Sequence, residues 1–452
     1  MNRLIDRIDF KRIFFRDTIY TRNSLLEAIK NMSVHISGHY HSDSPFILLT
    51  AHNHIKTVIA YYAILQLGKI AVILDPEARN FDITEIIDDT EPGALILINT
   101  STIEFNYEEE IVFRNTPANF ILSSDLADVC TIAYTNAEDG YVKGAMLTSR
   151  NLLCEVEAIV QSINITKNSI TCSLLPFHHM FGLVQGILIT TLTGGQSVIT
   201  EVSLLQLEEI AKRISKFNVT HFFSIPSIYF ILSKIEGIDT YLKNLQYVVS
   251  GGNKLSPFIY ERFLKKTKKY IREGYGLTET SPACVFHYEA EIPDVNTIGT
   301  PMPGTKVKIV DKHGNECPAN TEGEILVYGD LVFKGYLNKI DETNRKLVNN
   351  WLHTGDKGKI DEQGNIYFTG LIKKMINVSG NNVYPERLKR FMEMHSNVIE
   401  TKIESVESCL HGHTVEAFIR LKDNSIAKQK EYKQWCKENI TNITLPKSWY
   451  FE

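Results

Sequence analysis

Short apolar runs alternate with segments of helical spacing through the first part of the chain. Residues 46–50 (F-I-L-L-T) form one apolar run, and residues 55–67 repeat apolar side chains every three to four positions. A second cycle joins residues 71–74 to a helical segment at 81–90, and residues 94–98 begin a third. Strands that alternate with helices predict parallel sheets with helices packed on their faces.

The same pattern returns in the middle of the chain and then changes. Residues 219–223 and 245–250 predict two more strands, each followed by a helix that begins at a proline. From residue 298 onward, short apolar stretches separated by tight turns predict a small antiparallel β unit. Beyond residue 373, strands at 400–405 and 415–421 and a helix at 427–439 predict a small α+β segment.

Composition excludes several classes of function. The 452 residues carry a net charge of −5 without a long basic run, so nucleic acid and anionic membrane surfaces are not expected partners. Seven scattered cysteines without a C-x-x-C pair predict reduced thiols and a cytoplasmic location, with neither a disulfide framework nor a zinc site. No signal peptide is expected, and the most apolar run, residues 180–194, is too short and too polar for a membrane span.

The residue types needed to bind a nucleotide occur together in residues 272–280, R-E-G-Y-G-L-T-E-T. Tyr275 offers a ring for a base, and Gly276 permits close approach. Thr278 offers a hydroxyl to a phosphate, and Glu279 offers a carboxylate to Mg²⁺. The alternative is a glycine-rich turn around a buried tyrosine.

A second stretch, residues 367–385, reads Y-F-T-G-L-I-K-K-M-I-N-V-S-G-N-N-V-Y-P. Together and in this order, the two stretches resemble the acyl-adenylate-forming superfamily of acyl- and aryl-CoA ligases, peptide-synthetase adenylation domains and luciferases, with acyl-CoA ligases closest in motif style. The resemblance implies an α/β fold. A large AMP-binding domain at 1–372 would hold parallel sheets flanked by helices and a small β-barrel subdomain, and a small mobile α+β domain would occupy 373–452.

The resemblance also assigns roles to individual residues. Tyr275 and Gly276 would lie at adenine, Thr278 would contact phosphate, and Glu279 would bind Mg²⁺. The adenine and the acyl chain would lie against the turn at Gly251 and Gly252. Asp356, in W-L-H-T-G-D, matches the family's ribose aspartate, since a carboxylate at a strand end can accept both ribose hydroxyls.

Residues 175–182, L-P-F-H-H-M-F-G, give information about the acid substrate. This segment resembles the family's P-x-x-H-x-x-G, which would put His179 at the acyl pocket; the alternative is an ordinary core or surface histidine. Amino-acid-activating members carry an aspartate near here for the substrate amine, and this chain has Phe181 and Gly182 instead. A fatty or aromatic acid without an α-amine is therefore favoured, in an apolar pocket that Ala283, Cys284 and Val285 would help to line.

The hinge region both matches the family and departs from it. Lys373 matches the hinge residue about which the small domain turns, and Gly380 matches the loop that lines the tunnel for the thiol. Leu371 stands where the family has an arginine that contacts the nucleotide, so five N–H donors are lost.

The phosphate loop shows a second departure. Residues 134–144, Y-T-N-A-E-D-G-Y-V-K-G, resemble the family's Y-T-S-G-T-T-G-x-P-K-G, and Thr135, Gly140 and Lys143 are kept to bind phosphates. Glu138 and Asp139 replace two hydroxyl positions, and each carboxylate repels a nearby phosphate charge by about 1 kcal/mol even in water. Residues 445–452 resemble the stretch before the family's catalytic lysine, and the given sequence has no G-K segment after them.

Two functions follow from these motifs. The first is an ATP-dependent ligase that uses Mg²⁺, activates a carboxylic acid, with a fatty or aromatic acid favoured, as acyl-AMP, and transfers the acyl group to CoA or an acyl-carrier protein. The second is a catalytically impaired or thioester-step-only homologue that acts as a binding or regulatory partner. The altered phosphate loop, Leu371 and the missing lysine favour the second, because all three would weaken adenylate formation.

The phosphate loop allows a direct test. Replacing Glu138 and Asp139 by threonine should raise the affinity for ATP about fivefold or more, because it removes repulsion of about 1 kcal/mol per charge pair. Isothermal titration calorimetry with ATP and Mg²⁺ would measure the change, and an unchanged affinity would remove the carboxylates as an obstacle.

Overall fold

The computed structural model describes residues 4–16, 18–40, 42–98, 111–112, 126–136, 141–201, 207–288, 291–372, 376–378, 381–408, 412–440 and 445–452. Gly140, Lys373 and Gly380, and also Glu138 and Asp139, lie outside these residues. The chain forms two compact units. The first comprises Met1–Pro76, Glu91–Ala133 and Ala145–Gly370, and the second comprises Glu77–Thr90, Tyr134–Gly144 and Leu371–Glu452. The boundary between 372 and 373 and the mobility of a C-terminal domain stay predictions.

Among the described residues, nine strands form a mixed sheet in the order β15-β14-β13-β12-β11-β9-β10-β1-β2. The strands from β13 to β1 run parallel, and antiparallel strands extend the sheet at both edges. The bounds are β1 Arg12–Phe15, β2 Thr18–Thr21, β9 Ile170–Ser173, β10 Gln196–Ile199, β11 His221–Ser224, β12 Tyr247–Ser250, β13 Ile271–Tyr275, β14 Val285–Phe286 and β15 Thr300–Pro301. The strands predicted at 219–223 and 245–250 are β11 and β12.

A second sheet contains seven strands within the described part of the chain, in the order β18-β8-β7-β4-β3-β5-β6. The three strands predicted from the first apolar runs are β3, β4 and β5, and β3 pairs in parallel with the other two. The bounds are β3 Phe46–Thr50, β4 Ile70–Leu74, β5 Ala94–Ile96, β6 Ile111–Val112, β7 Val129–Asn136, β8 Val142–Thr148 and β18 Gly335–Tyr336. The predicted α/β fold with parallel sheets is confirmed.

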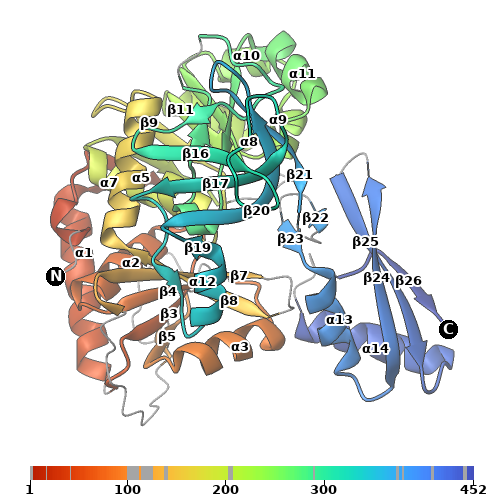
Figure 1. Ribbon diagram of the computed structural model, residues 1–452. Coiled ribbons are helices and arrows are strands. Elements are labelled where there is room, and N and C mark those ends of the chain that lie inside the picture. The colour runs from red at the N-terminus through yellow and green to blue at the C-terminus, as the bar shows by residue number, and fades with distance from the viewer. Residues whose placement is uncertain are drawn as a thin grey trace. The chain divides into compact units, whose positions relative to one another are not determined.

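Helices of the first unit bury apolar faces against these sheets and one another. Helix α2 (Ile55–Gln66) is buried along nearly its whole length and packs on β3, β4 and α1 (Arg22–His39), which lies beside it in Figure 1. Thr21 caps the start of helix α1, and its side chain accepts a hydrogen bond from the Ser24 N–H in a capping box. The other helical segments are η1 Ile5–Arg7, α5 Ser149–Ser162, α6 Met180–Leu183, the π-helical η3 Val184–Leu188, α7 Ile189–Thr193, α8 Leu207–Lys216, α9 Pro226–Leu232, α10 Ile238–Tyr241, α11 Pro257–Thr267, η5 Thr278–Thr280 and α12 Ile340–Lys346.

The antiparallel unit predicted after residue 298 is a sheet of five strands in the described chain. β16, β17, β20 and β19 follow one another across it, and β21 pairs with β20. The bounds are β16 Thr305–Val310, β17 Gly323–Gly329, β19 Leu347–Val348, β20 Trp351–Ile360 and β21 Ile366–Leu371. A turn at Gly314, with φ of +84°, supplies the left-handed backbone conformation that favours glycine.

The second unit is the predicted small α+β segment together with helix α3 (Asn80–Thr90). Its described strands follow the order β23-β22-β25-β24, with β26 beside β25. Phe81 of α3 belongs to the unit's apolar core, with its ring 5.0 Å from that of Phe391. The bounds are β22 Ile376–Val378, β23 Asn381–Val383, α13 Pro385–Glu393, β24 Val398–Ser408, β25 Gly412–Leu421, α14 Ile426–Asn439 and β26 Ser448–Phe451.

Buried charge also joins α3 to α13 inside the second unit. Arg387 is buried, forms an ion pair with Asp82 at 3.0 Å, and forms another with Glu85. Its guanidinium carbon lies 4.7 Å from the centre of the Phe81 ring. Removing one partner of such a group leaves uncompensated buried charge, which costs more than the loss of an exposed ion pair.

Arg387→Ala should therefore destabilise the second unit by about 3 kcal/mol. Arg420→Ala is the matched control, because its ion pair with Glu400 is exposed and should contribute less than about 1 kcal/mol. Urea unfolding followed by the fluorescence of Trp435, which stacks on Phe391, would measure both changes. Equal losses of unfolding free energy in the two variants would show that the buried ion pair contributes no more to stability than the exposed one.

Candidate functional site

In the R-E-G-Y-G-L-T-E-T stretch, the residues that follow Tyr275 leave the end of β13 and form a tight turn. Cys284 donates its backbone N–H to the Tyr275 carbonyl at 2.9 Å. A Cβ on Gly276 would lie 2.0 Å from the carbonyl oxygen of Pro282, so only glycine fits at this position. Thr280 accepts from the Leu277 N–H at 2.8 Å. The turn thus presents Thr278 and Glu279, both half-buried, directly after a strand of the parallel sheet.

Tyr275 and Asp356 are brought together across 81 residues of sequence. The Tyr275 hydroxyl donates to Asp356 Oδ2 at 2.7 Å. Asp356 is buried on β20, where its backbone N–H also donates to the Thr354 hydroxyl at 3.0 Å. Burial and the adjacent Asp356 raise the pKa of Tyr275 well above its ordinary range, so the phenol stays a donor. The two residues predicted to contact adenine and ribose are therefore neighbours, and both roles stay predictions.

The turn after β12 lies against the segment predicted to contact the acyl group. A Cβ on Gly251 would lie 2.5 Å from Cε1 of Phe181, so glycine allows this ring to reach the backbone. Gly252 has φ of +77°, a conformation that favours glycine. The predicted adenine turn and the residues that follow His179 are thus side by side in the first unit.

His179 precedes helix α6 and is exposed, with its ring 4.4 Å from that of His178. His178 Nδ1 lies 3.8 Å from Asp75 Oδ1, and burial lowers the pKa of His178 well below its ordinary range. Exposure of His179 is compatible with a contact to substrate, and its role stays a prediction. A π-helical segment follows in η3, and its buried Gln185 has Oε1 without a hydrogen-bond partner in the described structure.

Three residues that support the site were not predicted from the sequence. Asn53 donates from Nδ2 to the Leu175 carbonyl at 3.0 Å and accepts from the Phe177 N–H at 2.8 Å, which fixes the segment before His179. Glu155 accepts from the Ala283 N–H at 3.0 Å, and Tyr336 donates to Glu279 Oε1 at 2.6 Å. The polar stretch A-H-N-H that follows strand β3 was a signal for Asn53, whereas no local pattern marks Glu155.

Of the three loop residues predicted to bind phosphates, Thr135 and Lys143 are described, and both belong to the second unit. Thr135 lies on β7 and is half-buried, and Lys143 is buried on β8. Tyr134, next to Thr135, donates its hydroxyl to Asp89 Oδ2 at 2.7 Å. The strand that leads into the loop, β7, is therefore hydrogen-bonded to α3. The phosphate roles of Thr135 and Lys143 stay predictions.

The residues present fit a Mg²⁺ ion held jointly with nucleotide phosphates. Glu279 and the Thr278 hydroxyl supply oxygen donors, which are the ligands that Mg²⁺ prefers. Within the described residues there is no cluster of three or more histidine, cysteine or acidic side chains that could hold a metal. A magnesium ion held by one carboxylate and by the phosphates of the substrate would need no such cluster.

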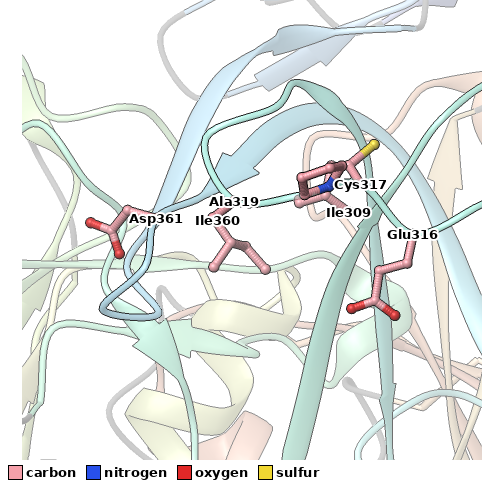
Figure 2. Close-up of a pocket in the computed structure, with 7 residues that line it drawn as sticks. Ile309, Glu316, Cys317, Ala319, Ile360 and Asp361 are labelled. Atoms are coloured by element: carbon pink, nitrogen blue, oxygen red, sulfur yellow. The ribbon is translucent and has the colours of Figure 1, made fainter.

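One cavity lies away from these residues, in the antiparallel sheet unit (Figure 2). It has a volume of about 170 Å³ and is lined by Ile309, Glu316, Cys317, Pro318, Ala319, Ile360 and Asp361. Ligand pockets usually span about 300–1,000 Å³. None of the predicted site residues lines this cavity, and its size does not suit a nucleotide or an acyl chain.

Glu273, two residues before Tyr275, is a buried acid. Its Oε1 accepts from the Leu255 N–H at 3.0 Å, and its Oε2 is buried without a partner in the described structure. Burial raises the pKa of Glu273 to about 8. An unfolded chain binds this proton only below about pH 4.3, so between the two pKa values the folded state holds a proton that the unfolded state has lost.

Glu273 should therefore make the protein less stable as pH rises from about 4.5 to about 8. Glu273→Gln removes this titration, so its stability relative to wild type should increase with pH by at most about 1.4 kcal/mol per unit. Urea unfolding at about pH 5 and about pH 8 would measure the difference. Glu362→Gln, at an exposed turn, controls for the loss of a carboxylate, and a pH-independent effect of Glu273→Gln would contradict the account.

No helix in the part of the chain that the structure describes is long and apolar enough to cross a membrane. In sequence, a long-chain-fatty-acid–CoA ligase from Escherichia coli O6:H1 (strain CFT073) is 31% identical over 325 residues, which are 71% of this chain and 57% of that protein. This chain thus spans less than two thirds of the length of that relative.

Two solved structures share the fold. A double mutant of o-succinylbenzoate CoA synthetase from Bacillus subtilis superposes with a TM-score of 0.85 at 22% identity, over 99% of this chain and 92% of that one. A malonyl-CoA ligase bound to methylmalonyl-CoA and AMP gives a TM-score of 0.82 at 22% identity, over 100% and 97%. The model of the family described as AMP-binding enzyme matches residues 6–337. The chain therefore belongs to the AMP-binding enzyme family, within the acyl-adenylate-forming superfamily that its motifs resemble.

Proposed function

We propose that this protein is an ATP-dependent acid–thiol ligase. A carboxylate oxygen of the acid attacks the α-phosphorus of ATP, forming the acyl–phosphate bond of acyl-AMP and releasing pyrophosphate. The sulfur of a thiol then attacks the acyl carbonyl, which forms a thioester, releases AMP and sheds the thiol proton. The acceptor is CoA or an acyl-carrier protein, and the expected cytoplasmic location stays a prediction.

The contact between Tyr275 and Asp356 carries this proposal. The Tyr275 hydroxyl lies 2.7 Å from the Asp356 carboxylate. The hydrogen bond therefore joins an aromatic ring and an acid, the two kinds of side chain that would bind the base and the ribose of a nucleoside. A hydrogen bond to a charged group contributes about 1.5–3 kcal/mol, so this aspartate alone would account for much of the affinity for ribose.

The other predicted site residues would bind the phosphates, the metal ion and the thiol. Thr278 would donate to phosphate, as would Thr135, Lys143 and the loop glycine Gly140. Mg²⁺, with Glu279 as ligand, would neutralise phosphate charge. Lys373 would act as the hinge and Gly380 would line the path of the thiol. These assignments rest on motif positions and on the half-buried, accessible state of Thr278 and Glu279.

An acid without an α-amine is the proposed substrate class. Phe181, with its ring against Gly251, occupies the region where amino-acid-activating members use an aspartate. Phe177, Met180 and Leu183 are buried nearby in sequence, which gives the segment an apolar character. Both fatty and aromatic acids suit these residues, and the similar proteins include a long-chain-fatty-acid–CoA ligase and an o-succinylbenzoate CoA synthetase.

Sequence departures favour one second candidate, a homologue that performs only the thioester step or only binds its ligands. Glu138 and Asp139 place two acceptors in a loop that needs donors. Leu371, the last residue of β21, replaces a nucleotide-contacting arginine. Both changes would weaken the binding of ATP, and neither alters Tyr275 or Asp356.

Mass spectrometry of acyl-AMP separates the two candidates. The protein would be incubated with ATP, Mg²⁺ and fatty, aromatic and amino acids. We expect acyl-AMP from a fatty or aromatic acid, and Asp356→Asn should reduce its rate of formation at least about tenfold through the lost ribose contact. Asp361→Asn is the matched control, because Asp361 holds an exposed turn through Asn365 on the same sheet.

Absence of acyl-AMP with every acid would contradict the proposed ligase. Synthetic acyl-AMP and CoA would then be supplied together. Thioester formation under those conditions would establish the thioester-step homologue, and its absence would leave a binding role.

A further inference from the structure

Tyr336 connects the predicted magnesium ligand to the strand that leaves the phosphate loop. It forms β18 with Gly335, and this short strand pairs antiparallel with β8, Tyr336 opposite Ala145 and Gly335 opposite Met146. Ala145 stands two residues after Lys143 along the chain. A side chain on β18 is therefore fixed in register with the residues that follow the loop.

The segment around Tyr336 holds Glu279 at two points. The Tyr336 hydroxyl donates to Glu279 Oε1 at 2.6 Å, and the Phe333 N–H donates to the Glu279 carbonyl at 2.9 Å. The rings of Phe333 and Tyr336 meet edge to face with centroids 4.8 Å apart. One segment thus positions both the backbone and the carboxylate of Glu279. Tyr336, in that segment, is 57 residues away from Glu279 in sequence.

Tyr336 is itself rigidly supported. Its side chain is buried, and its backbone N–H donates to the Thr343 hydroxyl at 2.9 Å. Asn151 of α5 donates from Nδ2 to the carbonyls of Asp330 at 2.7 Å and Val332 at 2.8 Å, just before the segment. The phenol therefore has little freedom to follow Glu279 if that side chain rotates.

We propose that Tyr336 is a positioning residue that orients the Glu279 carboxylate for a divalent cation bound together with the nucleotide. The proposal rests on the proposed function, since it presumes that a metal–nucleotide complex binds here. The hydrogen bond fixes one carboxylate oxygen, so the other is presented in one direction without an entropy cost at the moment of binding. Partners that orient metal-binding carboxylates typically change metal affinity by about 10–100-fold when removed.

Orientation of Glu279 explains the presence of a tyrosine at position 336 better than packing alone does. Packing against Phe333 requires only the ring, and phenylalanine would supply it. The hydroxyl instead meets a half-buried carboxylate at a distance typical of a charge-assisted O–H···O⁻ bond. Tyr336→Phe removes that one oxygen and keeps the ring, so it separates orientation from packing.

Binding of Mn²⁺ in place of Mg²⁺ tests the proposal without relying on catalysis. Electron paramagnetic resonance would measure free Mn²⁺ in the presence of a non-hydrolysable ATP analogue. We expect Tyr336→Phe to weaken Mn²⁺ binding about tenfold or more, while the analogue's affinity without metal changes less than about twofold. Tyr432→Phe is the control, since that hydroxyl donates to the Met392 carbonyl in the second unit.

A double-mutant cycle with Glu279→Gln shows whether Tyr336 acts through Glu279. The expected result is that Tyr336→Phe causes no further loss of Mn²⁺ affinity once Glu279→Gln is present. Unchanged Mn²⁺ affinity in Tyr336→Phe, or additive losses in the cycle, would overturn the inference. Failure of the wild-type protein to bind the Mn²⁺–analogue complex at all would instead overturn the proposed ATP-dependent function, and this inference with it.

Discussion

The hydrogen bond from Tyr275 to Asp356 is the constraint on which the candidate site depends. A carboxylate buried at 4% exposure needs hydrogen-bond partners, because leaving it without them costs several kcal/mol. The phenol of Tyr275 satisfies that need at the carboxyl end of a parallel strand, and β20 supplies the aspartate from the antiparallel sheet. The parallel sheet and the antiparallel sheet must therefore keep a fixed relation within the first unit for either residue to be stable where it lies.

The same chemistry occurs again a few residues further along the chain. Glu279 is also held by a phenol, Tyr336, from a segment distant in sequence. In each pair, a neutral donor orients an acid without cancelling its charge. An arginine or a lysine in the same place would neutralise the carboxylate and compete with a sugar hydroxyl or a cation for it. Phenols are thus suited to prepare acids that must later bind something else.

Local sequence patterns were sufficient for much of the fold. The run at 46–50 coincides with β3, and the segment at 55–67 differs from α2 by one residue at its end. Both elements are nearly fully buried, so their composition alone distinguishes them from loops. The antiparallel sheet was also predictable, because its turns carry residues such as Gly314, which adopts the left-handed backbone conformation of a tight turn without steric cost.

Contacts between distant segments were not predictable in this way. Glu155 and Tyr336 owe their positions to tertiary structure: one meets the Ala283 N–H across 128 residues, and the other meets Glu279 across 57. Neither lies in a periodic pattern that marks a partner. Asp356 was predicted only because its surrounding motif resembles the family, and its bond to Tyr275 could not be read from either motif by itself.

A crystal structure of the protein with AMP would test the central claim most directly. The account predicts the adenine against the Tyr275 ring and the ribose hydroxyls on Asp356, with the Tyr275–Asp356 hydrogen bond intact. AMP bound elsewhere, or bound only after Tyr275 had rotated away from Asp356, would contradict the claim that this pair is prepared for a nucleoside.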